Sequence, residues 1–571
     1  MTGKYISRRD FLKVAALGIG AATLGGCRPP ATPTEAPAAP TTAPQATPVP
    51  TTPPEPTEVP VVEVTITTSG WPVDVKKPED IEADPTNEAY AAAVQAWLDQ
   101  NPGTKLEKVE VDIWNTEGIM AQVAGGTDCT YLFGPCVGGG WGRENAVNAF
   151  VQGMLADITP IIAKYKLEER CLPHLWKTWS VNSQVDGKYF CYPLNEYSPD
   201  AGTLIYRKDL INELGLKEPE VNWTWDEARE VLKGLTSEAD GRYGAGFATW
   251  FLPYYCAQHG WDLLTETPVP AQPWHWTRDL TSDPRWVELI EQYREMLFVD
   301  KSIYSDVALG GGDEEYFKLF HAGQIAMGRF NFWSMFGRPT EPTSLSAMAD
   351  REGKAYSDMF GVATLPLGDG YLLGSGVRLW GPVSFSPNQS AEVHDKAVGL
   401  VDWMFFDKGL DMTKKGIYDI TPDPRAVFSA FLYMDGRTGY EGVPGTAADA
   451  WGQEIVDRWY EVGALPVEPS RDEYLPAEQN PSPSNQAIDD QLNLMVTDPS
   501  TLDIPTMLKQ GEDDWKAQVE GFASSVSAED FKAGVQKYYT ALDEYLKTNY
   551  PDFYENRFKP FYEGSVLPNI G

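Results

Sequence analysis

The sequence predicts an α/β protein in which a parallel sheet is followed by a mostly helical C-terminal part. Strand patterns alternate with helical patterns from Val62 onward, and the order strand, helix, strand requires crossover helices over a parallel sheet. From Ala447 onward the apolar residues recur at helical spacing. The chain has 571 residues, of which 42% are hydrophobic, so it can bury the cores of two or three domains and is not a disordered protein.

Three strands and one helix are predicted in the first part of this region. Asp84 supplies an N-cap and Pro85 the first helical position, and the helix ends at Asn101-Pro102-Gly103. The apolar face of this helix consists of Tyr90, Val94, Trp97 and Leu98. The apolar residues that define the three strands are Val62, Val64 and Ile66, then Val109, Val111 and Ile113, and then Tyr131, Leu132 and Phe133.

Four further helices are predicted from capping residues and apolar stripes. Thr224 and Glu227 have the spacing of a capping box, and the helix that they open runs through Leu235. Apolar stripes predict helices over residues 286–297 and 397–406. The last helix opens at Ser527-x-x-Asp530, and its expected buried face is Phe531, Val535, Tyr538, Leu542 and Tyr545.

Charge and aromatic content narrow the possible functions. The chain has 46 Lys and Arg against 82 Asp and Glu, a formal net charge of −36. Nucleic-acid phosphates require a basic surface, and no Lys- or Arg-rich tract is present, so we expect no nucleic-acid partner. The 19 Trp and 27 Tyr exceed what core packing usually requires, and such side chains offer flat surfaces on which a ligand can stack.

The N-terminal residues are typical of an exported lipoprotein. Ser7-Arg8-Arg9-Asp10-Phe11-Leu12-Lys13 resembles the twin-arginine export motif, and the apolar segment 14–24 that follows is shorter than the about 20 residues that span a bilayer. Leu24-Gly25-Gly26-Cys27 resembles the lipobox of bacterial lipoproteins. We therefore expect residues 1–26 to be a signal peptide that is removed, and Cys27 to carry the lipid that anchors an extracytoplasmic protein to the cell membrane. A chance cysteine after an apolar run is the alternative.

Residues 27–60 are predicted to form a tether. The segment is rich in Pro, Thr and Ala and contains no Gly, a composition that favours extended polyproline geometry and cannot build a core. The alternative is that this tract is a proline-rich recognition ligand.

A series of short motifs follows in a fixed order. The motifs are Trp97-Leu98-Asp99-Gln100-Asn101-Pro102-Gly103, Ala124-Gly125-Gly126-Thr127-Asp128, Asp186-Gly187-Lys188-Tyr189, Leu204-Ile205-Tyr206-Arg207-Lys208-Asp209-Leu210, Trp223-Thr224-Trp225-Asp226-Glu227 and Phe320-His321-Ala322-Gly323-Gln324-Ile325-Ala326-Met327-Gly328. Over residues 60–435 their order resembles the extracellular solute-binding lipoproteins of bacterial ABC-type sugar importers, the maltose-binding-protein-like family. The sequence departs from the family pattern at Asp128, which is followed by Cys129 and is not preceded by Pro.

This resemblance implies a two-lobe periplasmic-binding-protein-like fold, with two α/β domains, a hinge and a cleft, and with extra C-terminal helices. Lobe one would comprise residues 61–198 and 376–432, and lobe two residues 199–375 and 433–571 with the C-terminal helical extension. Segments that cross between the lobes are expected near residues 195–203, 373–378 and 425–439. The implied role is that of a monomer, without a cofactor, that captures a carbohydrate, an oligosaccharide, in the cleft and delivers it to the permease subunits of an ABC importer.

Candidate ligand-binding residues follow from the chemistry of sugars. Sugar rings present flat C–H faces and a rim of hydroxyls, so their sites need aromatic planes and side chains that make several hydrogen bonds. The stacking candidates, which lie at predicted strand ends or crossings, are Trp71, Trp141, Trp250, Trp333 and Trp380. The polar candidates are Asp128, Arg143, Glu196, Asn331 and Arg378. Each Trp could instead be a buried core or interface residue. Asp128 could instead cap a helix, and Arg143 could instead form an ion pair on the surface.

Two other function classes stay open at this point. The same fold can bind another solute, such as a peptide or a polyamine, and a surface polysaccharide-degrading enzyme needs only a pair of carboxylates. No catalytic residue and no metal ligand is predicted, because the five His form no HExxH motif and Gly374-Ser375-Gly376 lacks the full nucleophile elbow.

The cysteines allow more than one arrangement. Those that follow Cys27 are Cys129, Cys136, Cys171, Cys191 and Cys256. Their number is odd, so at least one thiol stays unpaired within a monomer, and the pairs that would close short loops are Cys129 with Cys136 and Cys171 with Cys191. No CxxC pair exists, so a cysteine zinc site is not expected.

Overall fold

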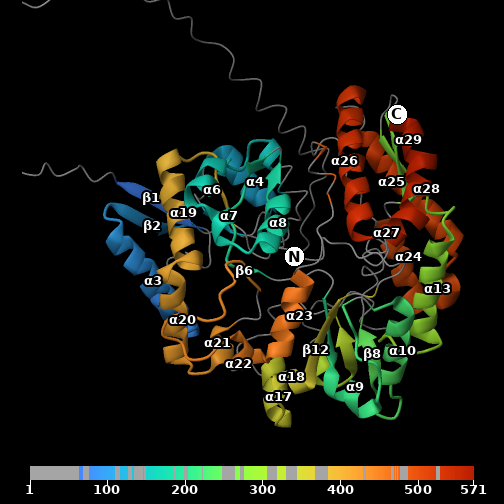
Figure 1. Cartoon of the computed structure of the whole chain (residues 1–571), viewed down its shortest axis with the longest axis horizontal. Coiled ribbons are helices and arrows are strands. Elements are labelled where there is room, and N and C mark those ends of the chain that lie inside the picture. The colour runs from blue at the N-terminus through green and yellow to red at the C-terminus, as the bar shows by residue number, and fades with distance from the viewer. Residues whose placement is uncertain are drawn as a thin grey trace, which may run out of the picture. The chain divides into compact units, whose positions relative to one another are not determined.

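The computed structural model describes much of the chain beyond residue 62 (Figure 1). The described residues are 63–68, 76–109, 116–126, 131–133, 146, 149–185, 187–197, 203–221, 223–246, 264–270, 275–304, 318–328, 344–364, 366, 383–428, 432–463, 469, 471, 474–475, 486–522 and 527–570.

The first sheet is the parallel sheet that the sequence predicts. Its strand order is β13-β3-β1-β2, and β1 is parallel to both β2 and β3, whereas β13 joins β3 antiparallel. The strands are β1 Val64–Thr68, β2 Thr104–Lys108, β3 Tyr131–Phe133 and β13 Val383–Phe385. Helices α3 Asn87–Gln100, α19 Ala391–Phe406 and α20 Lys408–Ile420 pack together beside this sheet and share its core.

The predicted start of helix α3 and the predicted position of the second strand are wrong. Helix α3 begins after Thr86, and the Asp84 carboxylate instead accepts a hydrogen bond from the Thr86 N–H at 3.1 Å, so it closes a turn before the helix. The second strand is 104–108, ahead of the predicted apolar alternation, whose Val111 and Ile113 lie outside the described residues. Strand β2 is the last strand in the order of the sheet and alternates between half-buried and exposed residues, which explains its polar sequence.

The second sheet is mixed and is buried on both faces. Its order is β12-β7-β11-β8, with strands β7 Thr203–Arg207, β8 Tyr243–Gly246, β11 Ile325–Gly328 and β12 Phe360–Thr364. Strand β7 is antiparallel to both of its neighbours, and β11 is parallel to β8. Successive side chains of a strand point to opposite faces, so Ile205 belongs to the hydrophobic cluster shared with the first sheet, whereas Leu204 and Tyr206 belong to a second cluster.

Two of the predicted crossing segments pair with each other. Strand β6, Glu196–Tyr197, and strand β14, Leu432–Tyr433, form an antiparallel ladder, the hinge pair, in which Tyr433 faces Glu196. The ladder is extended by the buried Asn195, whose backbone and side-chain oxygens accept from the Met434 and Asp435 N–H groups at 2.9 and 3.1 Å. The crossing predicted near residues 373–378 lies outside the described residues.

The helices predicted from caps and apolar stripes are all present. Helix α10, Trp225–Leu235, has the predicted Thr224 and Glu227 capping box, and α26, Ala528–Asn549, is capped by Ser527. The five residues predicted to form the buried face of α26 are all buried. Helix α13, Pro284–Phe298, and α19 cover the two predicted apolar stripes.

The remaining elements connect these parts. In the first half of the chain they are α2 Pro78–Ala83, α4 Thr116–Gly125, α6 Thr159–Tyr165, α7 Leu167–Arg170, α8 Pro173–Asn182, β4 Gln184–Val185, β5 Lys188–Tyr189, α9 Lys208–Leu214, β9 Glu266–Val269 and β10 His275–Arg278. In the second half they are α17 Leu345–Glu352, α18 Tyr356–Met359, α21 Pro424–Val427, α22 Ala447–Trp451, α23 Gln453–Gly463, α24 Gln486–Thr497, η5 Pro499–Thr501, α25 Ile504–Phe522, α27 Pro551–Phe553, η6 Tyr554–Phe558, α28 Lys559–Phe561, η7 Tyr562–Val566 and α29 Leu567–Ile570.

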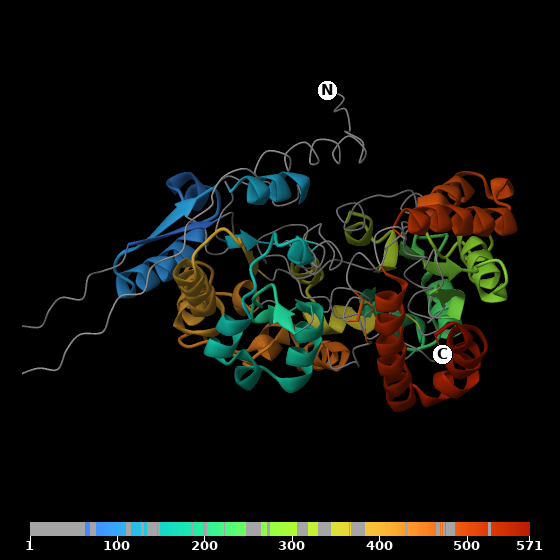
Figure 2. The same ribbon diagram turned by 90° about the horizontal axis from the view of Figure 1, so that it is seen from above.

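The C-terminal helices pack in two places. Figure 2 shows α24 and α25 beside α13, where their apolar residues complete the second cluster. Helix α26 and the helical segment from α27 to α29 form a third cluster with Trp276 of strand β10, and we call these C-terminal helices and this cluster the C-terminal module. The module is therefore seated on the hairpin of β9 and β10.

A buried group of charges ties this hairpin to the chain beyond β14. Glu266 of β9 accepts from the guanidinium groups of Arg278 at 2.7 Å and Arg471 at 2.5 Å, and the three side chains are only 6, 7 and 16% exposed. The Arg471 guanidinium also lies 3.8 Å from the ring centroid of Trp276. Burial raises the pKa of the Glu266 carboxyl, but the two guanidinium groups outweigh this effect and hold the pKa below its usual value.

One of the two possible cysteine pairs is not formed. Cys171 and Cys191 are both buried free thiols, so they do not close a short loop, and Cys129, Cys136 and Cys256 lie outside the described residues. Among the residues that the structure describes, no cluster of His, Cys, Asp and Glu has the geometry of a metal site. Within the same residues, no helix combines the length and the apolar character needed to cross a membrane.

Replacement of Arg471 should loosen the C-terminal module. In Arg471→Met one of the two cations around the buried Glu266 is lost, and breaking a buried pair in this way costs about 3 kcal/mol. We expect this variant to exchange hydrogen faster than wild type in α26 and at the wild-type rate in α10. Mass spectrometry measures both helices in the same protein.

The matched control is Arg294→Met, because Arg294 pairs with Glu291 on the surface of α13 and about a third of its side chain is exposed. Equal exchange in α26 of both variants would contradict this role of Arg471. The depressed pKa of Glu266 adds a pH dependence: its stabilising contribution is complete above the unfolded-state pKa of about 4.3 and is lost as the pH falls through the lower folded value.

Candidate ligand-binding site

A pocket lies directly beside the hinge pair. It is enclosed by β14, the loop that follows β14, α22 and α23, and its volume is about 240 Å³. The residues that line it are Tyr433, Arg437, Thr438, Thr446, Ala447, Ala448, Gln453, Val456, Trp459 and Tyr460. We call this cavity the hinge pocket.

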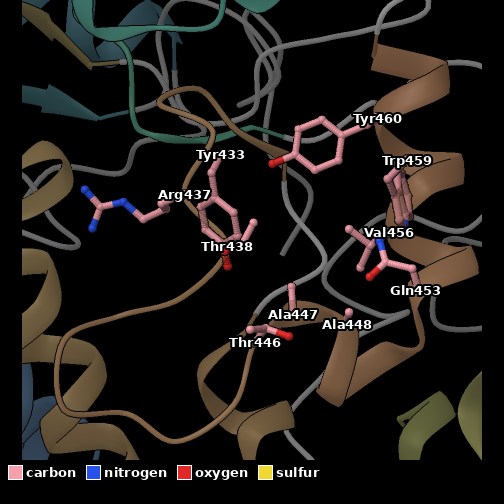
Figure 3. A pocket seen from close by; sticks show the side chains of 10 residues that line it. All are labelled: Tyr433, Arg437, Thr438, Thr446, Ala447, Ala448, Gln453, Val456, Trp459 and Tyr460. Carbon is pink, nitrogen blue, oxygen red and sulfur yellow. The ribbon is translucent and has the colours of Figure 1, made fainter.

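The lining combines aromatic rings with hydrogen-bonding groups. Figure 3 shows Tyr433 on one side of the hinge pocket, with Gln453 and Val456 of α23 opposite and Tyr460 at a third side. Arg437 extends away from the centre of the pocket (Figure 3). Aromatic faces beside amide and hydroxyl groups suit a small polar ligand that also has an apolar face.

Local sequence explains how α22 and α23 enclose the pocket. Thr446 caps α22 in a capping box with Asp449, so the first turn of α22 is fixed next to β14. Gly452 joins the two helices at a φ of 90°, and a Cβ on it would lie 2.6 Å from the Cβ of Ser357. Only glycine fits this position, and it allows α23 to turn back along the hinge pair.

A buried ion pair connects the hinge pair to α20. The Glu196 carboxylate of β6 pairs with the Lys414 ammonium of α20, and these side chains are only 10 and 8% exposed. The Tyr440 hydroxyl donates to the same carboxylate at 3.4 Å, and the Lys414 ammonium lies 5.4 Å from the centroid of the Tyr440 ring. The cation and carboxylate are therefore removed from water together, which requires that each keeps its partner.

Tyr440 links this ion pair to the wall of the hinge pocket. Its ring stacks on Phe428 at 5.2 Å and meets the edge of Tyr433 at 5.7 Å. Burial raises the pKa of the Tyr440 hydroxyl well above its usual value, so the hydroxyl is neutral and acts as a donor. Arg437 completes the link, because its guanidinium bonds Asp435 at 2.7 Å and lies 3.7 Å from Asp411 of α20.

Glu196 is the predicted site residue that the structure describes. Besides its partners in the hinge pair it lines a cavity of about 10 Å³, which is the size of roughly one water molecule. Its carboxylate thus has a structural partner in Lys414, and its contact with a ligand stays a prediction. The predicted residues outside the described part of the chain are Trp71, Asp128, Trp141, Arg143, Trp250, Asn331, Trp333, Arg378 and Trp380.

The lining of the hinge pocket was missed by sequence reasoning. Its residues all lie at position 433 or later, at or beyond the end of the region, residues 60–435, over which the motifs resemble the family. One signal was present, namely the adjacent aromatic residues Trp459 and Tyr460 in an amphipathic helix just after a predicted crossing. Neighbouring side chains on a helix point about 100° apart, so one of two adjacent aromatics can lie at the edge of the apolar face, where it can border a cavity.

Comparison with known proteins identifies the family. Residues 83–411, more than half of the chain, match the family model of the bacterial extracellular solute-binding proteins. The chain belongs to this family. Its members bind solutes outside the cytoplasm, in agreement with the resemblance found in the sequence.

Solved structures of this family share the fold at low sequence identity. A sugar transporter from Rhizobium etli in an open conformation is 17% identical with a TM-score of 0.51, and the GacH receptor of Streptomyces glaucescens, solved unliganded and with acarbose, is 15% identical with a TM-score of 0.51. The maltose-bound MalE3 of T. maritima is 18% identical with a TM-score of 0.50. Each comparison covers 80% of this chain and 99% of the other, which confirms the two-lobe α/β fold. No curated protein matches the sequence.

Replacement of Lys414 should destabilise the hinge pair. Lys414→Met leaves the Glu196 carboxylate buried without its cation, and such a change costs about 3 to 5 kcal/mol. We expect a lower midpoint of thermal unfolding, and a recovery of most of the loss in the double variant Glu196→Gln/Lys414→Met.

The control is the neighbouring residue Lys415, whose pair with Asp419 is exposed on α20. Lys415→Met should change the unfolding free energy by no more than about 1 kcal/mol. The pairing of Glu196 and Lys414 would be contradicted if the double variant lost more unfolding free energy than the two single variants lose when their losses are added.

Proposed function

We propose that this protein captures a carbohydrate, an oligosaccharide, between its lobes and delivers it to the permease subunits of an ABC importer. The observation that carries this proposal is the hinge pocket, in which aromatic rings stand beside amide and hydroxyl groups next to the paired crossing segments of a solute-binding protein. Acarbose and maltose are the ligands of two proteins with the same fold, which supports the same chemical class for this one.

The proposed mechanism is capture by closure. In a two-lobe protein a ligand that contacts both lobes binds the closed form better than the open form, and this difference in affinity shifts the equilibrium. The hinge pair is the segment about which such a movement would turn, and Tyr433 of this pair lines the hinge pocket. The predicted residues Trp71, Asp128, Trp141, Arg143, Glu196, Trp250, Asn331, Trp333, Arg378 and Trp380 are proposed to complete the site, without catalytic groups or a cofactor.

The proposed location is outside the cytoplasm, at the cell membrane. Family membership supports an extracytoplasmic protein, and the twin-arginine and lipobox resemblances of residues 1–27 support export followed by lipidation of Cys27. The tether of residues 27–60 would then hold a monomeric receptor near its permease.

Ligand class is tested by thermal unfolding of the purified protein against mono- and oligosaccharides, amino acids, peptides and polyamines. A ligand that binds only the folded state stabilises it by about 2.7 kcal/mol at one hundred times Kd, so the correct class raises the unfolding midpoint. We expect a shift with oligosaccharides and no new reducing ends. A shift with peptides or polyamines alone, or a polysaccharide that is shortened during incubation, would overturn the carbohydrate-receptor proposal.

Tyr460 allows the hinge pocket itself to be tested. Tyr460→Ala removes a half-buried ring that lines the pocket, and we expect the affinity for the stabilising oligosaccharide to fall about tenfold, which corresponds to about 1.4 kcal/mol. Calorimetric titration measures this change. Glu461→Ala is the control, because Glu461 is an exposed neighbour on α23 that pairs with Arg458. Equal affinities of the two variants would exclude the hinge pocket as the ligand site.

Lipidation has a separate test. Cys27→Ser removes the thiol that the lipid would modify, so we expect this variant to be released from the membrane fraction and to change its electrophoretic mobility. Unchanged membrane association and mobility would refute the lipobox interpretation.

A further inference from the structure

A second cavity lies at the seat of the C-terminal module, and it shares no residue with the hinge pocket. It is a groove of about 430 Å³ between the β9–β10 hairpin, the start of α13 and the helical segment from η6 to η7. Strand β9 contacts both η7 and α29. Sites for small ligands typically measure about 300 to 1,000 Å³, so the groove has room for a ligand the size of one or two sugar rings.

The two walls of the groove come from different parts of the chain. Thr267, Asp279 and Asp283 belong to the segment that matches the family model, residues 83–411. Asn556 and Phe561 belong to the C-terminal module, beyond this segment. The groove therefore exists only because the C-terminal module docks on the hairpin.

The buried charges fix the wall of the groove that the hairpin provides. Side chains alternate along a strand, so Thr267 of β9 faces the groove, whereas its neighbour Glu266 points inward to Arg471. On the other strand Arg278 binds Glu266, and the next residue, Asp279, lines the groove. The wall is thus attached to a rigid buried cluster, and a preformed wall loses little entropy when a ligand binds.

The chemistry of the lining favours an uncharged ligand. Its charged side chains are two carboxylates, of Asp279 and Asp283, and two guanidinium groups, of Arg285 and Arg557, so the groove has no net formal charge in a chain of net charge −36. Asp283 and Arg285 already pair with each other. Because the two signs balance, the groove favours neither a cation nor an anion overall, whereas hydroxyl groups of a ligand can both donate to carboxylates and accept from guanidinium groups.

Hydroxyl and amide side chains and one aromatic ring complete the lining. Thr267, Ser282, Ser565 and Asn556 supply further donors and acceptors, and the half-buried Phe561 supplies an apolar surface. An apolar ring within a set of neutral hydrogen-bonding groups suits a molecule with both a C–H face and several hydroxyls.

We propose that this groove is a second binding site, separate from the hinge pocket, and that it takes a neutral polyhydroxylated ligand, namely one or two sugar residues of a carbohydrate. The proposal rests on the lining of the groove and does not depend on the function assigned to the hinge pocket. A second site would let the protein hold a carbohydrate chain long enough to reach both cavities at two points, which raises its apparent affinity without new contacts in the hinge pocket.

The experiment is saturation-transfer NMR with maltotriose as the probe on the whole protein. Ala448→Trp fills the hinge pocket, and Ser282→Trp fills the groove from an exposed position at which the backbone N–H, which the substitution keeps, donates to Asp279. Lys537→Trp adds the same ring to an exposed position of α26 outside both cavities. Thermal unfolding establishes that each variant is folded, and Asn556→Ala serves as a second groove variant.

We expect Ala448→Trp to retain transfer from maltotriose. When Ser282→Trp is added to Ala448→Trp, we expect the affinity for maltotriose to fall about tenfold, which corresponds to about 1.4 kcal/mol. When Lys537→Trp is added instead, the affinity should not change. Loss of all transfer in Ala448→Trp, or equal transfer with and without Ser282→Trp, would overturn the second site. So would transfer from the dipeptide Gly-Gly in place of maltotriose, because the groove would then hold a zwitterion. If the wild type shows transfer and the single variant Ser282→Trp shows none, the result would support the groove and count against the hinge pocket.

Discussion

The antiparallel pairing of β6 with β14 is the constraint on which the rest of the structure depends. Strand β6 precedes β7 of the second sheet, and β14 follows α20 and α21, which come after the helix that packs on the first sheet. Their ladder therefore links chain segments that belong to both sheets. Its backbone polar groups are buried with Asn195 and must be paired, and the hydrogen bonds of Met434 and Asp435 achieve this. The pair of Glu196 and Lys414 then fixes the ladder to α20, so the position of Tyr433 in the hinge pocket follows from contacts made far away in the sequence.

The C-terminal module depends on a second buried charge group of a different design. Two guanidinium groups surround one carboxylate, and the excess positive charge is placed against the faces of Trp276 and Trp515, at 3.8 and 5.5 Å from Arg471 and Arg278. Burial of such a group is weak evidence of added stability, because the desolvation of three charges is costly. The group does fix the hairpin next to residue 471, because Glu266 keeps both of its cations only while Arg471 stays in this place.

Elements with local signals were predictable, and elements set by distant contacts were not. The Thr224 and Glu227 capping box and the apolar face of α26 identify their helices because each signal lies within the helix itself. Strand β2 was placed too late because it is the last strand of its sheet and carries no apolar alternation, and Asp84 closes a turn with Thr86, a role that its sequence does not distinguish from a helix cap. The hinge pocket was missed because its lining lies within residues 433–460, where the sequence shows little beyond a helical pattern, and because Tyr433 is positioned by a strand more than two hundred residues earlier.

The two cavities differ in what a ligand can accomplish by binding to them. A ligand shifts a conformational equilibrium only by the difference between its affinities for the two states. The hinge pocket includes Tyr433 of the hinge pair, so under the proposed mechanism a rearrangement of that pair would change the pocket, and a bound ligand would favour closure. The hairpin wall of the groove is instead attached to the buried cluster around Glu266, and the groove includes no residue of the hinge pair. Under the same proposal, a ligand in the groove would add affinity without causing closure, whereas a ligand in the hinge pocket would signal an occupied receptor to the permease.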